Sequence, residues 1–174
     1  TLNKRNEWDV IIDYEKFWNY VDIICKPNTA IIGGSKISTK IKLLNNLVEN
    51  FDNIIIGGAM ANTFLLAKGF NVGKSLVEKE LIETTNKILK KAINYNCTII
   101  LPTDVVCSND LNDSINIRHS DIDDILSDQM ILDIGNKTIQ VMKKTLLSSN
   151  MILWNGPLGA FEYKPFNYGT FQIA

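Results

Sequence analysis

Two lysines follow a glycine turn near the start of the chain, in a pattern that suits phosphate binding. The apolar run Thr29–Ile32 leads into Gly33-Gly34-Ser35-Lys36, and Lys40 comes four residues after Lys36. Glycines let a backbone approach a phosphate closely, and free N–H groups at a helix start favour anions. Two lysines at this spacing share one face of a helix. The alternative is a strand-to-helix turn with two solvated lysines, and the local pattern favours neither.

A second polar turn follows the apolar run Met151–Trp154. Asn155 and Pro157 lie in this turn, and Glu162 comes shortly after it. An amide can donate hydrogen bonds to phosphate oxygens, and a carboxylate can accept them from ribose hydroxyls. The alternative is a structural turn followed by a glutamate that the helix dipole favours. Taken alone, the local pattern favours this alternative.

A third turn, Gly57-Gly58-Ala59-Met60, follows the apolar run Asn53–Ile56. Because its glycines have no side chains, they leave room for a flat adenine ring beside the backbone. Close packing of a helix against a strand explains the same pattern and is preferred for the turn by itself. The turn alone therefore does not establish a site for a base.

Other candidates for chemistry have simpler explanations. Gly69–Ser75 resembles a P-loop, but Lys68 stands where the first glycine belongs. The stretch also follows a predicted helix instead of a strand, so we reject a P-loop. Asp104 and Asp133 lie near predicted strand ends and offer oxygen ligands that suit magnesium. Such residues more often cap turns, which is the preferred interpretation.

Apolar periodicity predicts alternating strands and helices that would position these turns. Strands are expected at 29–32, 53–56, 98–101, 105–107, 115–118, 130–134 and 151–154. Helices are expected at 13–24, 38–51, 59–68, 78–94, 137–147 and 162–174. The alternation predicts an α/β fold with a doubly wound parallel sheet, Rossmann-like, in three α/β/α layers. Ligands bind beyond the carboxyl ends of such strands, where the polar turns lie.

The composition limits the possible functions. A chain of 174 residues is enough for one domain, and its formal net charge of −1 gives no electrostatic footprint for nucleic acid. No apolar run reaches membrane-spanning length. The 3 cysteines form no CxxC pair, which favours free thiols and a cytoplasmic protein. Arg5 and Arg118 are the sole arginines, which argues against a bidentate clamp for carboxylate or phosphate in this chain.

Together these segments resemble the C-terminal, nucleotide-binding domain of the phosphoglycerate kinase family. The resemblance runs from about Lys26 to Thr170. Its blocks follow one another in order: Lys26-Pro27, Ala30–Lys36, Lys40-Ile41, Ile55–Gly58, Met60-Ala61, Thr63-Phe64, Gly73–Leu76, Leu101–Asp104, Leu132–Gly135 and Trp154–Glu162. Residues 1–25 are therefore interpreted as an N-terminal segment with an interdomain-type helix, and residues 26–174 as part of the nucleotide-binding domain. The sheet is expected to be incomplete at its C-terminus, since no strand follows the last predicted helix.

The resemblance implies a glycolytic phosphotransferase with a carboxyl group as acceptor. With Mg²⁺, it would convert ATP and 3-phosphoglycerate into ADP and 1,3-bisphosphoglycerate. Lys36 would approach the transferring phosphoryl group as the catalytic residue, and Lys40 would approach the nucleotide phosphates. Asn155 and Pro157 would face the triphosphate, and Glu162 the ribose. The resemblance also implies that the cleft is opened by Gly34, Gly57 and Gly58 and that the adenine pocket is lined by Leu76, Leu111 and Leu132.

Two positions depart from the family's usual pattern and add bulk near the expected adenine pocket. Ala59 replaces a third glycine, and Ile131 replaces a glycine before Leu132-Asp133. No metal ligand is expected within this chain, and 3-phosphoglycerate would be held by an N-terminal domain outside it. Because part of the enzyme would lie outside this chain, we expect the chain in isolation to turn over substrate poorly. The resemblance also implies a monomer. The alternative hypothesis is a non-catalytic remnant with a structural or partner-binding role.

Overall fold

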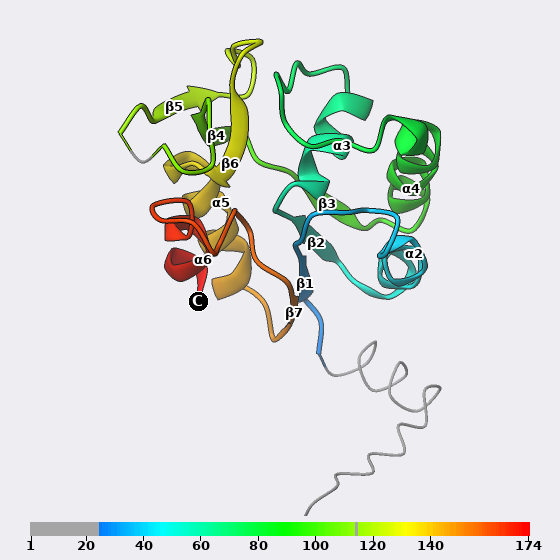
Figure 1. Ribbon diagram of the computed structural model, residues 1–174. Helices are drawn as coiled ribbons and strands as arrows, with labels where there is room; N and C mark the ends of the chain where they lie inside the picture. Colours follow the sequence, from blue (N-terminus) through cyan, green and yellow to red (C-terminus); the bar gives the residue numbers. More distant parts are fainter. Residues whose placement is uncertain (1–24, 114) are drawn as a thin grey trace, which may run out of the picture.

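A four-stranded parallel sheet forms the centre of the molecule. The computed structural model describes residues 25–113 and 115–174, and Figure 1 shows this sheet beside a smaller one. The strands of the central sheet lie in the order β3 (Thr98–Ile100), β2 (Asn53–Ile56), β1 (Asn28–Ile32) and β7 (Met151–Asn155). The predicted α/β fold with a parallel sheet is confirmed. The helix predicted at 13–24 lies outside the described residues.

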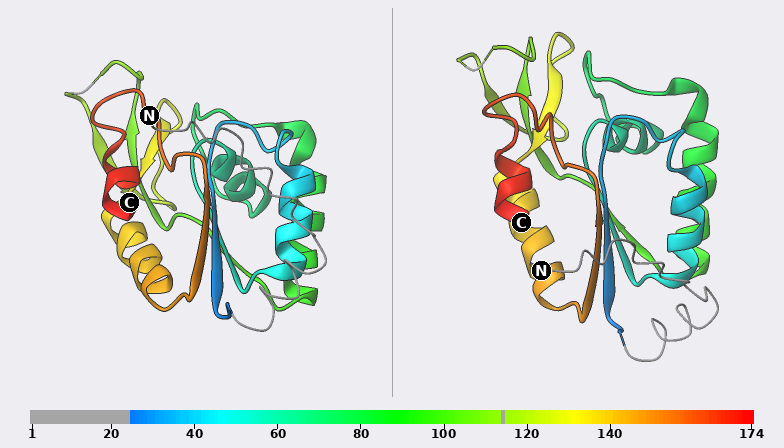
Figure 2. Two further views of the ribbon diagram at one scale, coloured as in Figure 1. Left: turned by 90° about the horizontal axis from the view of Figure 1, so that it is seen from below. Right: turned by 60° about the horizontal axis from the view of Figure 1, so that its bottom comes forward.

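Helices cover both faces of this sheet, as predicted for a three-layer fold. Figure 2 shows α2 and α4 on one side of the sheet and α5 and α6 on the other. Alternating isoleucines point to opposite faces of the strands: Ile32 and Ile56 pack with one buried cluster, whereas Ile31 and Ile55 pack with another. The helices of the first face are α2 (Ile41–Asn50), α3 (Met60–Ala67) and α4 (Ile82–Asn94), and those of the second are α5 (Asn136–Leu147) and α6 (Tyr168–Ile173).

The helices follow from apolar stripes at helical spacing. In α2, for example, Leu44, Leu47 and Val48 are buried while the intervening residues face outward. The helix predicted at 78–94 begins with a single 3₁₀ turn, η1 (Lys79–Leu81), and continues as α4. None of the helices among the described residues has the length and apolar character needed to cross a bilayer.

A second, antiparallel sheet was not anticipated from the sequence. Its strands lie in the order β5 (Arg118–Asp121), β4 (Asp104–Ser108) and β6 (Met130–Ile134). Pro102 follows β3 and separates it from β4, because proline supplies no N–H for a ladder. The central helix α3 contacts both sheets, with Phe64 in the cluster of the parallel sheet and Leu65 in that of the second.

Two predicted elements lie elsewhere in the structure. The strand expected at 115–118 is found at 118–121, because the Asp113 carboxylate accepts hydrogen bonds from the N–H groups of Ile115 and Asn116 and holds them in a turn. The helix expected at 162–174 begins at Tyr168. Pro165 explains the delay, since the residue before a proline avoids helical geometry.

Candidate functional site

The three polar turns meet at the carboxyl ends of β1, β2 and β7. Their backbones are joined directly: the N–H of Gly33 donates to the carbonyl of Asn155 at 2.9 Å, and that of Gly58 donates to the carbonyl of Leu158 at 2.8 Å. Met60 N donates to Gly34 O at 3.0 Å, which links the first turn to the third. The turns therefore form one connected edge, at the place where a parallel sheet binds ligands.

The glycines of these turns have different roles. Gly34 and Gly58 have φ values of +125° and +66°, in the region that side chains disfavour, and a Cβ on Gly58 would collide with the Gly34 backbone. A Cβ on Gly57 would instead collide with the Leu158 side chain. Gly34 and Gly58 line the cavity described next. Gly57 does not line it, and its lack of a side chain instead lets Leu158 pack closely against the backbone.

A cavity of about 410 Å³ lies between these turns and strand β6. Its volume falls within the ordinary range for small-molecule sites, roughly 300–1,000 Å³. The predicted site residues that line it are Gly34, Gly58, Leu76, Leu111, Leu132, Pro157 and Glu162. The lining therefore includes the apolar side chains of Leu76, Leu111 and Leu132, while the exposed carboxylate of Glu162 adds an acceptor.

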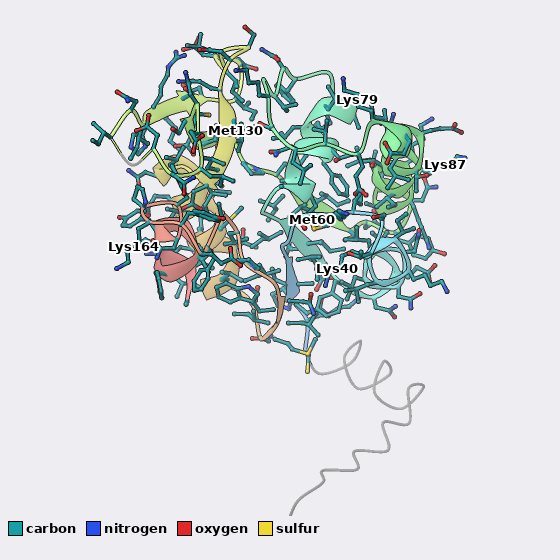
Figure 3. All side chains as sticks on the ribbon, in the orientation of Figure 1. Lys40, Met60, Lys79, Lys87, Met130 and Lys164 are labelled. Carbon is teal, nitrogen blue, oxygen red and sulfur yellow. The ribbon has the colours of Figure 1, made fainter. Side chains whose placement is uncertain are left out.

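Of the residues predicted to bind the phosphates, Pro157 lines the cavity, whereas Lys36, Lys40 and Asn155 lie outside its lining. The Lys40 ammonium group donates a hydrogen bond to the Asn155 side-chain oxygen, so α2 and β7 are tied together at this edge. Lys36 is exposed to solvent. Figure 3 shows Lys40 on the side of the parallel sheet that bears α2, and Met130 on β6 of the second sheet. The cavity thus has positive charge and an amide beside it.

Two buried polar residues of the cavity lining, Asn62 and Asp133, were not predicted as nucleotide-binding residues. Asn62 lies in α3 and is fully buried; its side-chain nitrogen donates to Leu76 O at 3.2 Å. Its side-chain oxygen has no hydrogen-bond partner among the described residues. The available signal was the polar pair Asn62 and Thr63 within the otherwise apolar run Met60–Ala67, and its meaning depends on the cavity beside it.

Asp133 is 2% exposed at the end of β6. Its carboxylate accepts hydrogen bonds from Gly169 N at 2.7 Å and from Ile134 N at 2.9 Å. Burial raises the pKa of Asp133 to about 7, against the lowering by these two backbone groups. The residue therefore connects β6 to α6 through a carboxyl group that is costly to ionise.

Asp104 has the capping role that was preferred for it. Its carboxylate accepts hydrogen bonds from Lys137 N at 2.9 Å and Thr138 N at 2.7 Å, which are free N–H groups in the first turn of α5. In the part of the chain that the structure describes, no group of three or more His, Cys, Asp or Glu side chains is placed to hold a metal ion.

Known proteins with the same arrangement identify the family. The family model for phosphoglycerate kinase matches residues 13–174. The chain belongs to the phosphoglycerate kinase family. It is 47% identical over 149 residues to the phosphoglycerate kinase of Jannaschia sp. (strain CCS1), an alignment that covers 86% of this chain and 38% of that protein.

Solved phosphoglycerate kinases have the same fold. The enzyme from Coxiella burnetii superposes with a TM-score of 0.86 and 37% identity, over 93% of this chain and 42% of that one. The enzyme from Pyrococcus horikoshii OT3 superposes with a TM-score of 0.73 and 25% identity, over 92% and 41%. This chain therefore spans well under half the length of these phosphoglycerate kinases.

Both departures from the usual pattern of phosphoglycerate kinases face the site. Ala59 and Ile131 line the cavity, on the turn after β2 and on β6. Each places more side-chain volume there than a glycine would. A cavity of about 410 Å³ remains in their presence.

Proposed function

We propose that this chain is the nucleotide-binding part of an enzyme that transfers a phosphoryl group between ATP and the carboxyl group of 3-phosphoglycerate. The products of the forward transfer are ADP and 1,3-bisphosphoglycerate. The observation that carries this proposal is the cavity, which leucines line in part and which has the Lys40–Asn155 pair close by, with Asn155 two residues before Pro157 of its lining. A nucleotide has the matching order of parts, with a flat apolar base at one end and charged phosphates at the other.

Each part of the nucleotide has residues that suit it. The base lies against Leu76, Leu111 and Leu132, and the ribose hydroxyls donate to Glu162. Lys40, Asn155 and Pro157 hold the phosphates, and Gly34, Gly57 and Gly58 keep the nucleotide cleft open. Lys36, whose positively charged side chain is exposed, stabilises the transferring phosphoryl group. Phosphoryl transfer needs positioning and neutralised charge more than covalent catalysis, which these residue types supply.

Mg²⁺ would accompany the nucleotide phosphates and offset part of their charge. As in the resemblance, we expect no protein ligand of the metal within this chain. 3-Phosphoglycerate binds outside this chain, in the remaining length that the relatives have. The functional enzyme is a cytoplasmic monomer, and this chain by itself turns over substrate poorly.

The proposal is tested by the shift in the thermal unfolding midpoint on adding Mg-ADP. A ligand that binds only the native state at a hundredfold excess over its Kd raises the free energy of unfolding by about 2.7 kcal/mol. For a chain of this size that corresponds to roughly 5–10 °C. A Lys40→Ala variant should shift much less, because a hydrogen bond to a charged group contributes about 1.5–3 kcal/mol.

Lys42→Ala is the matched control. Lys42 is an exposed lysine on the same helix, two residues along, and therefore points away from Asn155. The control should keep the full shift. Absence of any shift at millimolar Mg-ADP in the unchanged protein would contradict the proposal.

That negative result would favour the second candidate function, a non-catalytic structural or partner-binding role. The observation behind this alternative is the presence of Ala59 and Ile131 in the cavity lining, where the family usually has glycines. Extra bulk there opposes a bound base. The two functions therefore make opposite predictions for the same measurement.

A further inference from the structure

The short segment from Leu76 to Glu78 touches both the cavity and the turn that carries Lys36. Leu76 lines the cavity. Two residues later, the Glu78 carboxylate accepts a hydrogen bond from the backbone N–H of Ser38 at 3.1 Å. Ser38 is itself two residues after Lys36, in the turn that follows β1. The segment therefore joins two parts of the site that are 40 residues apart in the sequence.

Helix α3 holds this segment in place through two neighbouring polar side chains. The side-chain nitrogen of Asn62 donates to Leu76 O at 3.2 Å, and the hydroxyl of Thr63 accepts from Glu78 N at 3.1 Å. Both side chains are buried, in a helix that contributes to the core clusters of both sheets. The polar pair within the otherwise apolar α3 therefore fixes the backbone from which the Glu78 carboxylate extends.

The turn after β1 is fixed on its buried side and held by Glu78 on its exposed side. Ile37 is fully buried in the core, whereas Lys36 and Ser38 on either side of it are exposed. Burial acts to raise the pKa of Glu78, but hydrogen bonds from Ser38 and Ile37 and the charge of Lys36 lower it overall. Glu78 is therefore an ionised acceptor, and a hydrogen bond to an ionised group is stronger than one between neutral groups.

We propose that Glu78 is a positioning residue, which holds the turn after β1 so that Lys36 faces the transferring phosphoryl group. The inference rests on the proposed nucleotide-binding function and goes beyond it by naming the group that orders this turn. Glu78 does not line the cavity, so it acts through the turn and not on the nucleotide. Without its hydrogen bond to Ser38, Lys36 would lose more conformational freedom on binding a phosphoryl group, and its contribution would decrease.

The test compares the Kd values of Mg-ATP and Mg-ADP, measured by calorimetry on the whole chain. Because ATP carries the phosphoryl group that Lys36 would contact and ADP lacks it, the ratio of the two affinities reports how well Lys36 is placed. Lys36→Ala should weaken ATP binding relative to ADP by about tenfold, as expected for one hydrogen bond to a charged group. Glu78→Ala should change the ratio in the same direction by about threefold, with the Kd of ADP unchanged within about twofold. Equal weakening of ATP and ADP would assign Glu78 a merely structural role and overturn the inference.

Two further variants separate the hydrogen bond from the charge of Glu78. Glu78→Gln keeps an oxygen that can accept from the Ser38 N–H, so it should retain most of the ATP:ADP ratio that Glu78→Ala loses. Glu80→Ala is the matched control, because Glu80 is an exposed carboxylate two residues along, in η1. Its removal changes the net charge equally and should leave the ratio unchanged. A loss in Glu80→Ala as large as that in Glu78→Ala would overturn the inference.

The double variant Lys36→Ala/Glu78→Ala tests whether Glu78 acts through Lys36. If it does, the second substitution has little left to remove, and the double variant should have the same ATP:ADP ratio as Lys36→Ala alone. Independent losses that multiply in the double variant would overturn the inference and leave the proposed function intact. Binding of neither nucleotide to the unchanged protein would overturn both.

Discussion

The two faces of the parallel sheet are built from the same isoleucine-rich strands but are stabilised differently. On the first face Ile32 and Ile56 are fully buried under α2, α3 and α4, and the cover extends over the edge strand, where Met151 and Leu153 are partly buried. On the second face Ile31 and Ile55 are also fully buried. There, however, Ile152 and Trp154 of β7 are 49% and 36% exposed.

Polar contacts supplement the apolar packing on the second face. The N–H of Leu158 donates to the Thr170 hydroxyl at 3.0 Å, Lys143 donates to the Gln172 side chain at 3.1 Å, and Asp133 accepts from Gly169 N. On the first face Lys91 of α4 forms an ion pair with Glu49 of α2 near the surface, but the buried cluster itself is apolar and has no carboxyl group. The second depends in part on specific groups, one of which is a buried carboxyl.

The largest expected effect comes from removing buried volume on the first face. Ile32→Ala should lower the free energy of unfolding by about 2–5 kcal/mol, because the closely packed cluster cannot fill the space. Urea unfolding measures this loss. The control is Leu147→Ala, at the end of α5, where the side chain is 89% exposed and the change should stay within about 0.5 kcal/mol. Similar losses in the two variants would mean that the first face is not the tightly packed one.

An intermediate effect is expected from the carboxyl group on the second face. The pKa of Asp133 is raised from 3.8 to about 7, so between these values the folded state holds a proton that the unfolded state has lost. The contribution of Asp133 to stability therefore decreases as pH rises through this range and is constant above and below it. Asp133→Asn has no such group, so its stability should change less with pH.

The measurement is urea unfolding of both proteins at intervals from pH 4 to pH 8. The stability of the unchanged protein minus that of Asp133→Asn should fall as pH rises, and taking the difference removes the contributions that the two proteins share. A difference that is flat with pH, or that increases, would show that Asp133 is not held protonated by burial. It would also remove the contrast between the two faces in their response to pH.

Local patterns were enough to predict the parallel sheet. Runs such as Asn53–Ile56, bounded by glycine or proline, are buried strands because little else can bury so many consecutive apolar side chains. The second sheet was missed, because strand pairing between β4, β5 and β6 depends on distant partners that periodicity does not reveal. Pro165 was a sufficient signal for the late start of α6, since a proline there interrupts an otherwise helical pattern.

The candidate site was predicted in part by residue type and in part by resemblance. The turn at Gly34 is recognisable from the glycines and lysines around it. Leu76 and Leu111 lie in loops and are at least partly exposed, so nothing local marks them as cavity residues; the family resemblance supplied them. Asn62 could not be interpreted without the structure, because a polar residue within a helix acquires meaning only from what is buried around it.

The smallest effect is expected where the second face is open. Ile152→Thr keeps the branched Cβ that suits a strand and replaces a methylene and methyl with a hydroxyl at a half-exposed position. The free energy of unfolding should therefore change by no more than about 0.5 kcal/mol, as at other surface positions. The urea midpoint measures this directly. A loss comparable with that of Ile32→Ala would mean that Ile152 is covered in solution, for instance by a second copy of the chain, and sedimentation at two protein concentrations would then reveal the association.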